Sequence, residues 1–178
     1  MTSTGIGIEV RSLRLEDLDA IFTIDHQIRK TGSAVTYANI TTERVFTIDR
    51  HVGRWARPIG YADLIKGNVS ELLQLGMVAE VENHVRGFIL GRVTHVGERA
   101  TEVGVIIILG VHPDYQRRGI ASGLVSAMYD RFRSKGINKM RIAVDSRDNA
   151  LANFVEHMGF SVGHVIEYTK AIPRAPGL

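Results

Sequence analysis

The feature that most constrains the fold is an apolar run that leads through a glycine turn into an amphipathic helix. The run covers residues 103–111, enough for a strand buried on both faces, and the turn is the stretch Gln-Arg-Arg-Gly-Ile-Ala at residues 116–121. The first amides of a helix have no partner within it, so this order of elements forms an anion site. Gly119 keeps side-chain atoms away from the backbone, while Arg117 and Arg118 add positive charge. The sequence therefore predicts a turn that binds phosphate groups.

The rest of the chain predicts one mixed α/β domain over residues 1–172, followed by a short tail at 173–178. Asn83 is predicted in a left-handed hairpin turn, and Glu16 and Asp17 in the first turn of a helix, where the dipole favours acids. The predicted strands are 6–13, 77–81, 85–93, 101–111, 140–144 and 160–169, and the predicted helices begin near residues 15, 41, 69, 120 and 149. This order favours a mixed, mostly antiparallel sheet of six to seven strands with helices on both faces.

The composition excludes several classes of site. The chain has no cysteine, which excludes disulfides, thiolate zinc sites and a catalytic thiol, and fits a reducing cytoplasm. Its seven histidines show no metal-ligand spacing, so no metal is expected. The net charge of +3 predicts an ordinary solvated surface with one local phosphate site. No apolar run approaches the roughly 20 residues of a membrane helix, and no signal peptide is expected. We therefore expect a cytoplasmic protein that binds neither nucleic acid nor membranes.

Three motifs in this order resemble the GNAT (GCN5-related N-acetyltransferase) superfamily. Residues 109–121 are similar to its fourth strand running into the pyrophosphate loop, written Q/R-x-x-G-x-G/A. Residues 149–160, ending Met158-Gly159-Phe160, are similar to its later helix–strand junction. The opening strand, which leads to Asp17, is a weaker third match. The resemblance covers nearly the whole chain, and the motif gains weight from its place between a strand and a helix.

The resemblance implies acetyl-CoA as co-substrate, bound where the fourth and fifth strands separate. The pantetheine arm would pair with the backbone of the fourth strand, and the same amides would polarise the thioester carbonyl. The cofactor-binding residues that it implies are Leu109, Gly110, Val111, Gln116, Arg117, Arg118, Gly119, Ile120, Ala121, Ser122 and Asn149. Asn149 fits equally well as the cap of its own helix, as does Asp148, so both roles stay open for Asn149.

The chain departs from the family pattern in its acid and base groups. The position at which similar proteins carry a tyrosine acid is Val155, which has no proton to donate. Glu102 is the only acid on the fourth strand and is the candidate general base. It lies nine residues before Val111, so alternation puts the two on opposite faces unless Gly104 or Gly110 forms a bulge. The alternatives are an exposed carboxylate without a catalytic role, and ordered water as the proton carrier.

The predicted function is transfer of an acetyl group from acetyl-CoA to a primary amine, directly within a ternary complex. The acceptor would be a protein lysine, a protein N-terminus or a small amine. A non-catalytic acyl-CoA-binding regulatory module is the alternative, because the tyrosine is missing and the base is unassigned. A homodimer built on the exposed last strand is a further expectation.

Overall fold

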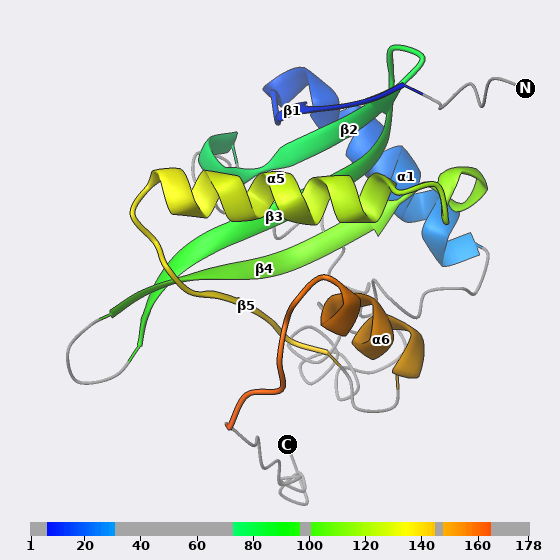
Figure 1. Ribbon diagram of the computed structural model, residues 1–178. Helices are drawn as coiled ribbons and strands as arrows, with labels where there is room; N and C mark the ends of the chain where they lie inside the picture. Colours follow the sequence, from blue (N-terminus) through cyan, green and yellow to red (C-terminus); the bar gives the residue numbers. More distant parts are fainter. Residues whose placement is uncertain (1–6, 31–72, 97–100, 145–147, 165–178) are drawn as a thin grey trace, which may run out of the picture.

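Five strands form one sheet in the computed structural model, which describes residues 7–30, 73–96, 101–144 and 148–164 (Figure 1). In chain order and in sheet order they are β1 (Ile8–Ser12), β2 (Met77–Val81), β3 (His84–Val96), β4 (Thr101–Val111) and β5 (Met140–Ile142). The first four pair antiparallel, and β5 runs parallel to β4. The predicted mixed, mostly antiparallel sheet is confirmed, with five strands in the described ranges rather than six or seven.

Part of the predicted secondary structure differs or lies elsewhere. Residues 160–164 belong to no helix or strand, so the described half of the predicted last strand is not a strand, and residues 165–169 lie outside the described residues. The helix predicted near residue 41 also lies outside them, whereas residues 73–75 form the end of the helix predicted from residue 69. The domain limits at 172 and 173 stay a prediction.

Helices cover both faces of the sheet, as predicted (Figure 1). The helix α5 (Ile120–Ser134) crosses one face, and α1 (Leu18–Lys30) packs on the other after a short 3-10 helix, η1 (Leu15–Asp17). Alternation along the strands feeds two separate cores, with Ile89 on the α5 side and Phe88 and Leu90 on the α1 side. A further helix, α6 (Asn149–His157), follows β5. The α5 segment makes the crossover between the parallel strands β4 and β5.

A bulge in β4 lies at Ile107 and not at either glycine. Leu90 of β3 pairs with Ile108 and Gly91 with Ile106, which leaves Ile107 as the extra residue. The glycines Gly104 and Gly110 serve close packing instead, since a Cβ on either would lie 2.6 Å from a phenylalanine ring. The extra residue switches the alternation along β4, so Glu102 and Val111 share a face after all.

Replacing Gly104 by alanine should destabilise the fold. The added Cβ would meet three ring atoms of Phe132 within 2.7 Å, and overpacking of this kind costs about 1–3 kcal/mol. Urea unfolding would measure this loss. Gly123→Ala is the matched control in the same helix–sheet interface, because its Cβ would lie 3.6 Å from Val10 and alanine favours a helix. Equal stability of the two variants would contradict the packing argument.

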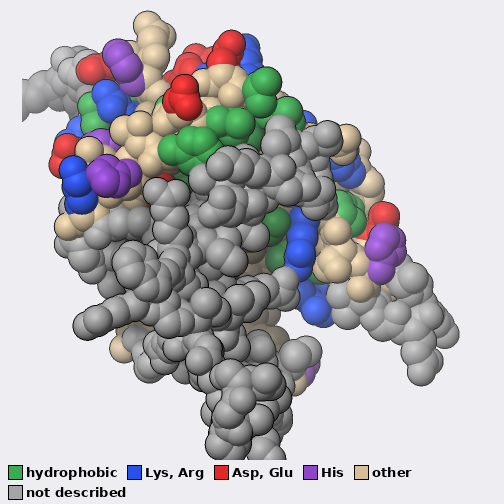
Figure 2. Space-filling view, turned by 180° about the vertical axis from the view of Figure 1, so that it is seen from behind, with side chains coloured by type: hydrophobic (Ala, Val, Ile, Leu, Met, Phe, Trp, Pro, Cys, Tyr) green, Lys and Arg blue, Asp and Glu red, His purple; other side chains and the backbone are tan. Residues whose placement is uncertain are grey.

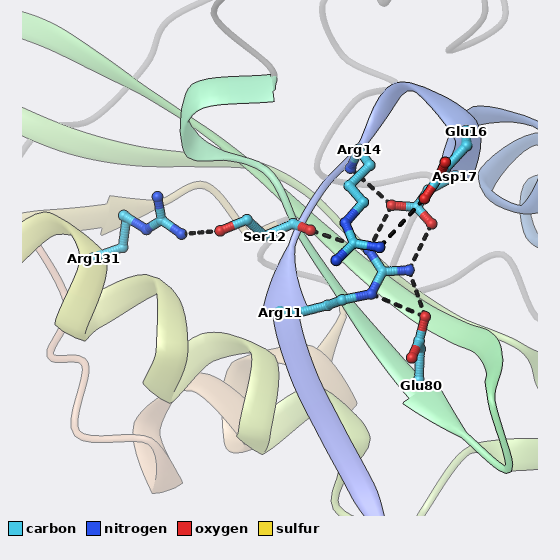
Figure 3. A network of polar contacts seen from close by, with 7 residues as sticks. All are labelled: Arg11, Ser12, Arg14, Glu16, Asp17, Glu80 and Arg131. Atoms are coloured by element: carbon cyan, nitrogen blue, oxygen red, sulfur yellow. Dashed lines mark hydrogen bonds and ion pairs between the residues drawn. The ribbon is translucent and has the colours of Figure 1, made fainter.

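A buried carboxylate ties β1 to the start of α1 (Figure 3). Arg11 of β1 donates to both oxygens of Asp17 at 2.8 Å, and its Nε donates to Glu80 of β2 at 2.9 Å. The Arg14 amide donates to Asp17 at 2.7 Å, and the Asp17 side chain is only 5% exposed. Asp17 is thus more than the first-turn acid that the sequence predicts. The network fixes the position from which α1 crosses the sheet.

Basic and acidic side chains are interspersed on the α1 side of the molecule (Figure 2). In that view the described Lys, Arg, Asp, Glu and His side chains lie around a short hydrophobic stretch and do not gather by sign. None of the helices in the described ranges is long and apolar enough to cross a membrane.

Candidate functional site

The outer edge of β4 loses its partner strand halfway along. The strand β5 pairs with β4 only from Gly104 to Ile106, whereas β3 accompanies β4 as far as Val111. Over the described part of the chain, residues 107–111 therefore have a strand on one side alone. The bulge at Ile107 falls where β5 ends, and a bulge commonly marks the point at which a ladder terminates. This leaves backbone amide and carbonyl groups of β4 unused by the sheet.

A tight turn returns the chain from the end of β4 to the start of α5. It contains the 3-10 helix η2 (Pro113–Tyr115), and the His112 amide anchors it by donating to the Arg86 carbonyl at 2.8 Å. The Gln116 side chain donates from Nε2 to the Val111 carbonyl at 3.2 Å. Gln116 thus closes the turn with a side-chain hydrogen bond.

The N-terminus of α5 opens on a glycine in the left-handed region. Gly119 caps the helix with φ +85° and has no side chain with which to accept from the first amides. The helix ladder starts with the Gly123 amide, which donates to the Gly119 carbonyl at 2.9 Å, so the amides of residues 120–122 precede it. Arg117 is also left-handed, with φ +61°, a conformation that non-glycine residues adopt at a cost of about 1–3 kcal/mol. Alternating left-handed residues turn successive amides toward one point, which suits an anion.

A cavity of about 340 Å³ lies between the free edge of β4, the start of α5 and α6. One wall is apolar and comes from distant parts of the chain, namely Ile28 of α1 and Leu151 and Phe154 of α6. The full lining is Ile28, Leu109, Gly110, Val111, Tyr115, Gln116, Arg117, Gly119, Ile120, Ala121, Ser122, Ala150, Leu151 and Phe154. The cavity thus combines apolar side chains with the first residues of α5 and with Arg117.

The cavity brings together most of the residues that the sequence assigns to a cofactor. The exceptions are Arg118 and Asn149, which do not line it. Asp148, and not Asn149, caps α6, because its side chain accepts from the Leu151 amide at 2.9 Å. The cofactor role of Asn149 stays a prediction. Arg118 instead lies over the ring of Tyr115, with its guanidinium carbon 5.1 Å from the ring centroid.

Sequence reasoning missed the apolar wall and Tyr115. Leu151 and Phe154 follow helical spacing, which predicts a core-facing stripe and not a cavity wall. Ile28 reaches the cavity only because α1 crosses the opposite face of the sheet and ends beside η2. The motif around residue 116 was the one local signal that marked this neighbourhood.

The structure does not bring Glu102 to the cavity. It lies near the start of β4, about 30 Å along the strand from Val111 at roughly 3.3 Å per residue. Its carboxylate is 56% exposed and lies 3.6 Å from Nε2 of His95 on the neighbouring strand. Val155, at the position of the expected tyrosine, is buried in α6. Among the described residues, no group of three or more acidic, histidine or cysteine side chains is arranged to hold a metal.

Comparison with known proteins places the chain in a family. A model of the acetyltransferase (GNAT) family matches residues 42–160. An acetyltransferase of Sodalis glossinidius is 34% identical over 88 residues, which make up 49% of this chain and 58% of that protein. The chain thus spans less than two thirds of the length of this relative.

Solved structures share the fold at low sequence identity. One is the aminoglycoside acetyltransferase AAC(6')-Iy in complex with a bisubstrate analogue of CoA, with a TM-score of 0.60, 19% identity, and coverage of 93% of this chain and 99% of that chain. Another is the ribosomal-protein-S18-alanine N-acetyltransferase of Escherichia coli, with a TM-score of 0.59, 17% identity, and coverage of 87% and 78%. These neighbours confirm the predicted fold class.

Proposed function

Because the chain belongs to the acetyltransferase (GNAT) family, we propose that it transfers an acetyl group from acetyl-CoA to a primary amine. The observation that carries the proposal is the cavity, in which an apolar wall meets the amides of a helix N-terminus. Acetyl-CoA has two matching parts, a long pantetheine arm for the apolar wall and a pyrophosphate for the helix amides.

The free edge of β4 supports binding of the pantetheine arm. The pantetheine arm contains two amides, which have the donors and acceptors of a peptide strand. Residues 109–111 of β4 offer the complementary backbone groups, because β5 does not pair with them. Ile28 and Phe154 would exclude water from the arm. A strand-like pairing would hold the arm along β4 and so set the position of the thioester.

The start of α5 supports binding of the pyrophosphate. The amides of residues 120–122 and the positive end of the helix dipole face the cavity together with Arg117. The space beside the Gly119 backbone is open, since a Cβ at this position would meet nothing within 4 Å. This room is what a phosphate oxygen needs to approach the backbone.

The chemistry that we propose is direct transfer. The amine nitrogen attacks the thioester carbonyl carbon, the carbon–sulfur bond breaks, and the CoA thiol leaves with a proton. An amide of β4 that points at the carbonyl oxygen would stabilise the negative charge that develops there. The chain has no cysteine to carry the acetyl group, which favours a ternary complex. Positioning of the two reactants is the main contribution that we assign to the protein, with water as the carrier of the amine proton.

The acceptor class in this proposal is a primary amine on a small molecule or a protein. Structures of the same fold include an aminoglycoside acetyltransferase and an enzyme named for a ribosomal-protein alanine. Calorimetric titration with acetyl-CoA, using ATP and NAD as controls, tests the cofactor, and release of CoA on addition of amines tests turnover. Selective binding with CoA release supports the proposal. Binding without release for any amine would instead support the acyl-CoA-binding regulatory module, and absence of binding would overturn both.

Glu102→Gln separates the candidate general base from a peripheral carboxylate. A general base contributes about 10²–10⁴-fold to the rate, whereas we expect a change within about twofold, since Glu102 is remote from the cavity. The pH dependence of kcat/KM should be the same for the variant and the wild type. A large loss of rate together with an altered acidic limb of the pH profile would make Glu102 the base.

A further inference from the structure

Two arginines bracket a tyrosine at the rim of the cavity, beyond the groups that serve the pyrophosphate. We propose that Arg118 and Arg86, organised on the ring of Tyr115, form a second anion site that binds the 3′-phosphate of acetyl-CoA. The site would give the protein a preference for acetyl-CoA over its 3′-dephospho analogue. This inference rests on the proposed function, and it adds specificity for one end of the co-substrate.

The geometry of the cluster is built from three elements. The guanidinium carbon of Arg86, at the start of β3, lies 4.6 Å from the Tyr115 ring centroid, and that of Arg118, before α5, lies 5.1 Å from it. His112 meets the same ring edge-on, with 5.6 Å between centroids and an interplanar angle of 86°. The Tyr115 ring itself lines the cavity. Two cations are thus held against a ring that is part of the site, as arginine–aromatic stacking allows.

The charges at the rim exceed what one pyrophosphate requires. The amides of α5 and the Arg117 side chain already face the cavity. Arg118 and Arg86 add two further guanidinium groups, each a planar fork suited to phosphate oxygens. Asp114, whose side chain is 83% exposed, lies 3.9 Å from Nδ1 of His112, which contacts the same ring. The surplus positive charge matches the third phosphate of CoA, on the ribose.

The two arginines have different roles. Arg118 is exposed on the turn and is the group that we expect to contact the phosphate. Arg86 is half-buried, and its Nε is buried without a hydrogen-bond partner among the residues described. It therefore acts as a positioning residue, which holds the Tyr115 ring and adds a fixed positive charge beneath it. Tyr115 keeps the exposed guanidinium of Arg118 at the rim of the cavity.

The experiment compares the affinities for acetyl-CoA and acetyl-3′-dephospho-CoA in the wild type and in Arg118→Gln. We expect the wild type to prefer acetyl-CoA by at least about tenfold, as one charge-assisted phosphate contact gives. Arg118→Gln should lose most of this preference, with its affinity for the dephospho analogue unchanged. Arg133→Gln is the matched control, because it removes an exposed arginine from the other end of α5. It should leave both affinities unchanged.

Three outcomes decide between the proposals. Equal affinity of the wild type for the two ligands would overturn the second anion site and leave the proposed function intact. Loss of affinity for both ligands in Arg118→Gln would also overturn it, since the arginine would then serve the pyrophosphate. Absence of binding of either ligand to the wild type would overturn the proposed function itself. Tyr115→Phe keeps the aromatic ring and should retain the preference for acetyl-CoA. Tyr115→Leu removes the ring and should lower that preference. Equal effects of the two variants would contradict a role of the ring.

Discussion

Gly119→Asp should lower the affinity for acetyl-CoA by at least about 100-fold, because juxtaposed like charges cost several kcal/mol. Asp at this capping position can accept from the amides of α5, so its carboxylate would occupy the place where the pyrophosphate is proposed to bind. The left-handed φ of Gly119 adds backbone strain of about 1–3 kcal/mol in the variant, so we expect a moderate loss of stability beside the larger loss of binding. Calorimetric titration with acetyl-CoA, together with thermal unfolding, measures the two effects separately.

Gly136→Asp provides a matched control for this variant. Gly136 follows the other end of α5, with φ +79° against +85° at Gly119, and both glycines have open space at the Cβ position. The substitution therefore adds the same charge and a similar backbone strain far from the proposed site. We expect its affinity for acetyl-CoA to equal that of the wild type. If the two variants bind equally well, the pyrophosphate does not lie at the start of α5.

Asp17→Ala should destabilise the fold by about 3 kcal/mol, which is the cost of removing one partner from a buried ion pair. Arg11 would keep its charge at 18% side-chain exposure, with Glu80 as its remaining acidic partner, and the Arg14 amide would lose its acceptor. Urea unfolding measures the loss. Glu16→Ala is the neighbouring control, because Glu16 pairs with Arg14 at 3.3 Å on the exposed surface and such pairs contribute about 0–1 kcal/mol. Similar losses in the two variants would contradict the buried network.

The contribution of Asp17 should depend on pH. Burial alone raises the pKa of this carboxyl, but the hydrogen bond from Arg11 and the one from the Arg14 amide outweigh it and hold the pKa below its usual 3.8. Since the pKa is lower in the folded state than in the unfolded chain, the stabilisation is present above the usual pKa and is lost as the pH falls through the lower one. The difference in unfolding free energy between wild type and Asp17→Ala should therefore be constant near pH 7 and shrink below about pH 4. A difference that stays constant down to pH 2 would contradict this linkage.

Local patterns predicted the elements with strong periodicity or turn chemistry. The hairpin at Asn83 has the left-handed φ of +61° that the asparagine favours, and Gly119, Gly136 and Gly159 all have the positive φ expected at helix ends. The helix predicted to begin near residue 15 starts instead as the 3-10 helix η1, in which Leu15 is 64% exposed. Hydrophobic periodicity predicts the ends of a helix less well than its middle, because the terminal turns are often 3-10.

The bulge position and the ion-pair network depend on contacts between distant residues. Gly104 and Gly110 suggested bulges, but both accommodate rings of Phe132 and Phe88, which no local pattern reveals. Likewise Asp17 meets Glu80 through Arg11 only because β1 and β2 pair in the register that the sheet imposes. A one-residue slip would move Glu80 to the other face.

The strand–turn–helix unit at residues 101–134 was predictable from local patterns, because strand hydrophobicity, a turn glycine and helical periodicity are local properties of the chain. The same local patterns predicted an anion-binding turn and indicated the family resemblance. The rest of the site depends on contacts between distant parts of the chain. Ile28 and Phe154 reach the cavity from separate helices, β5 ends at Ile142 and frees the edge of β4, and Arg86 comes to Tyr115 from a neighbouring strand. These contacts arise from the packing of elements far apart in the chain, on which local propensity has no bearing.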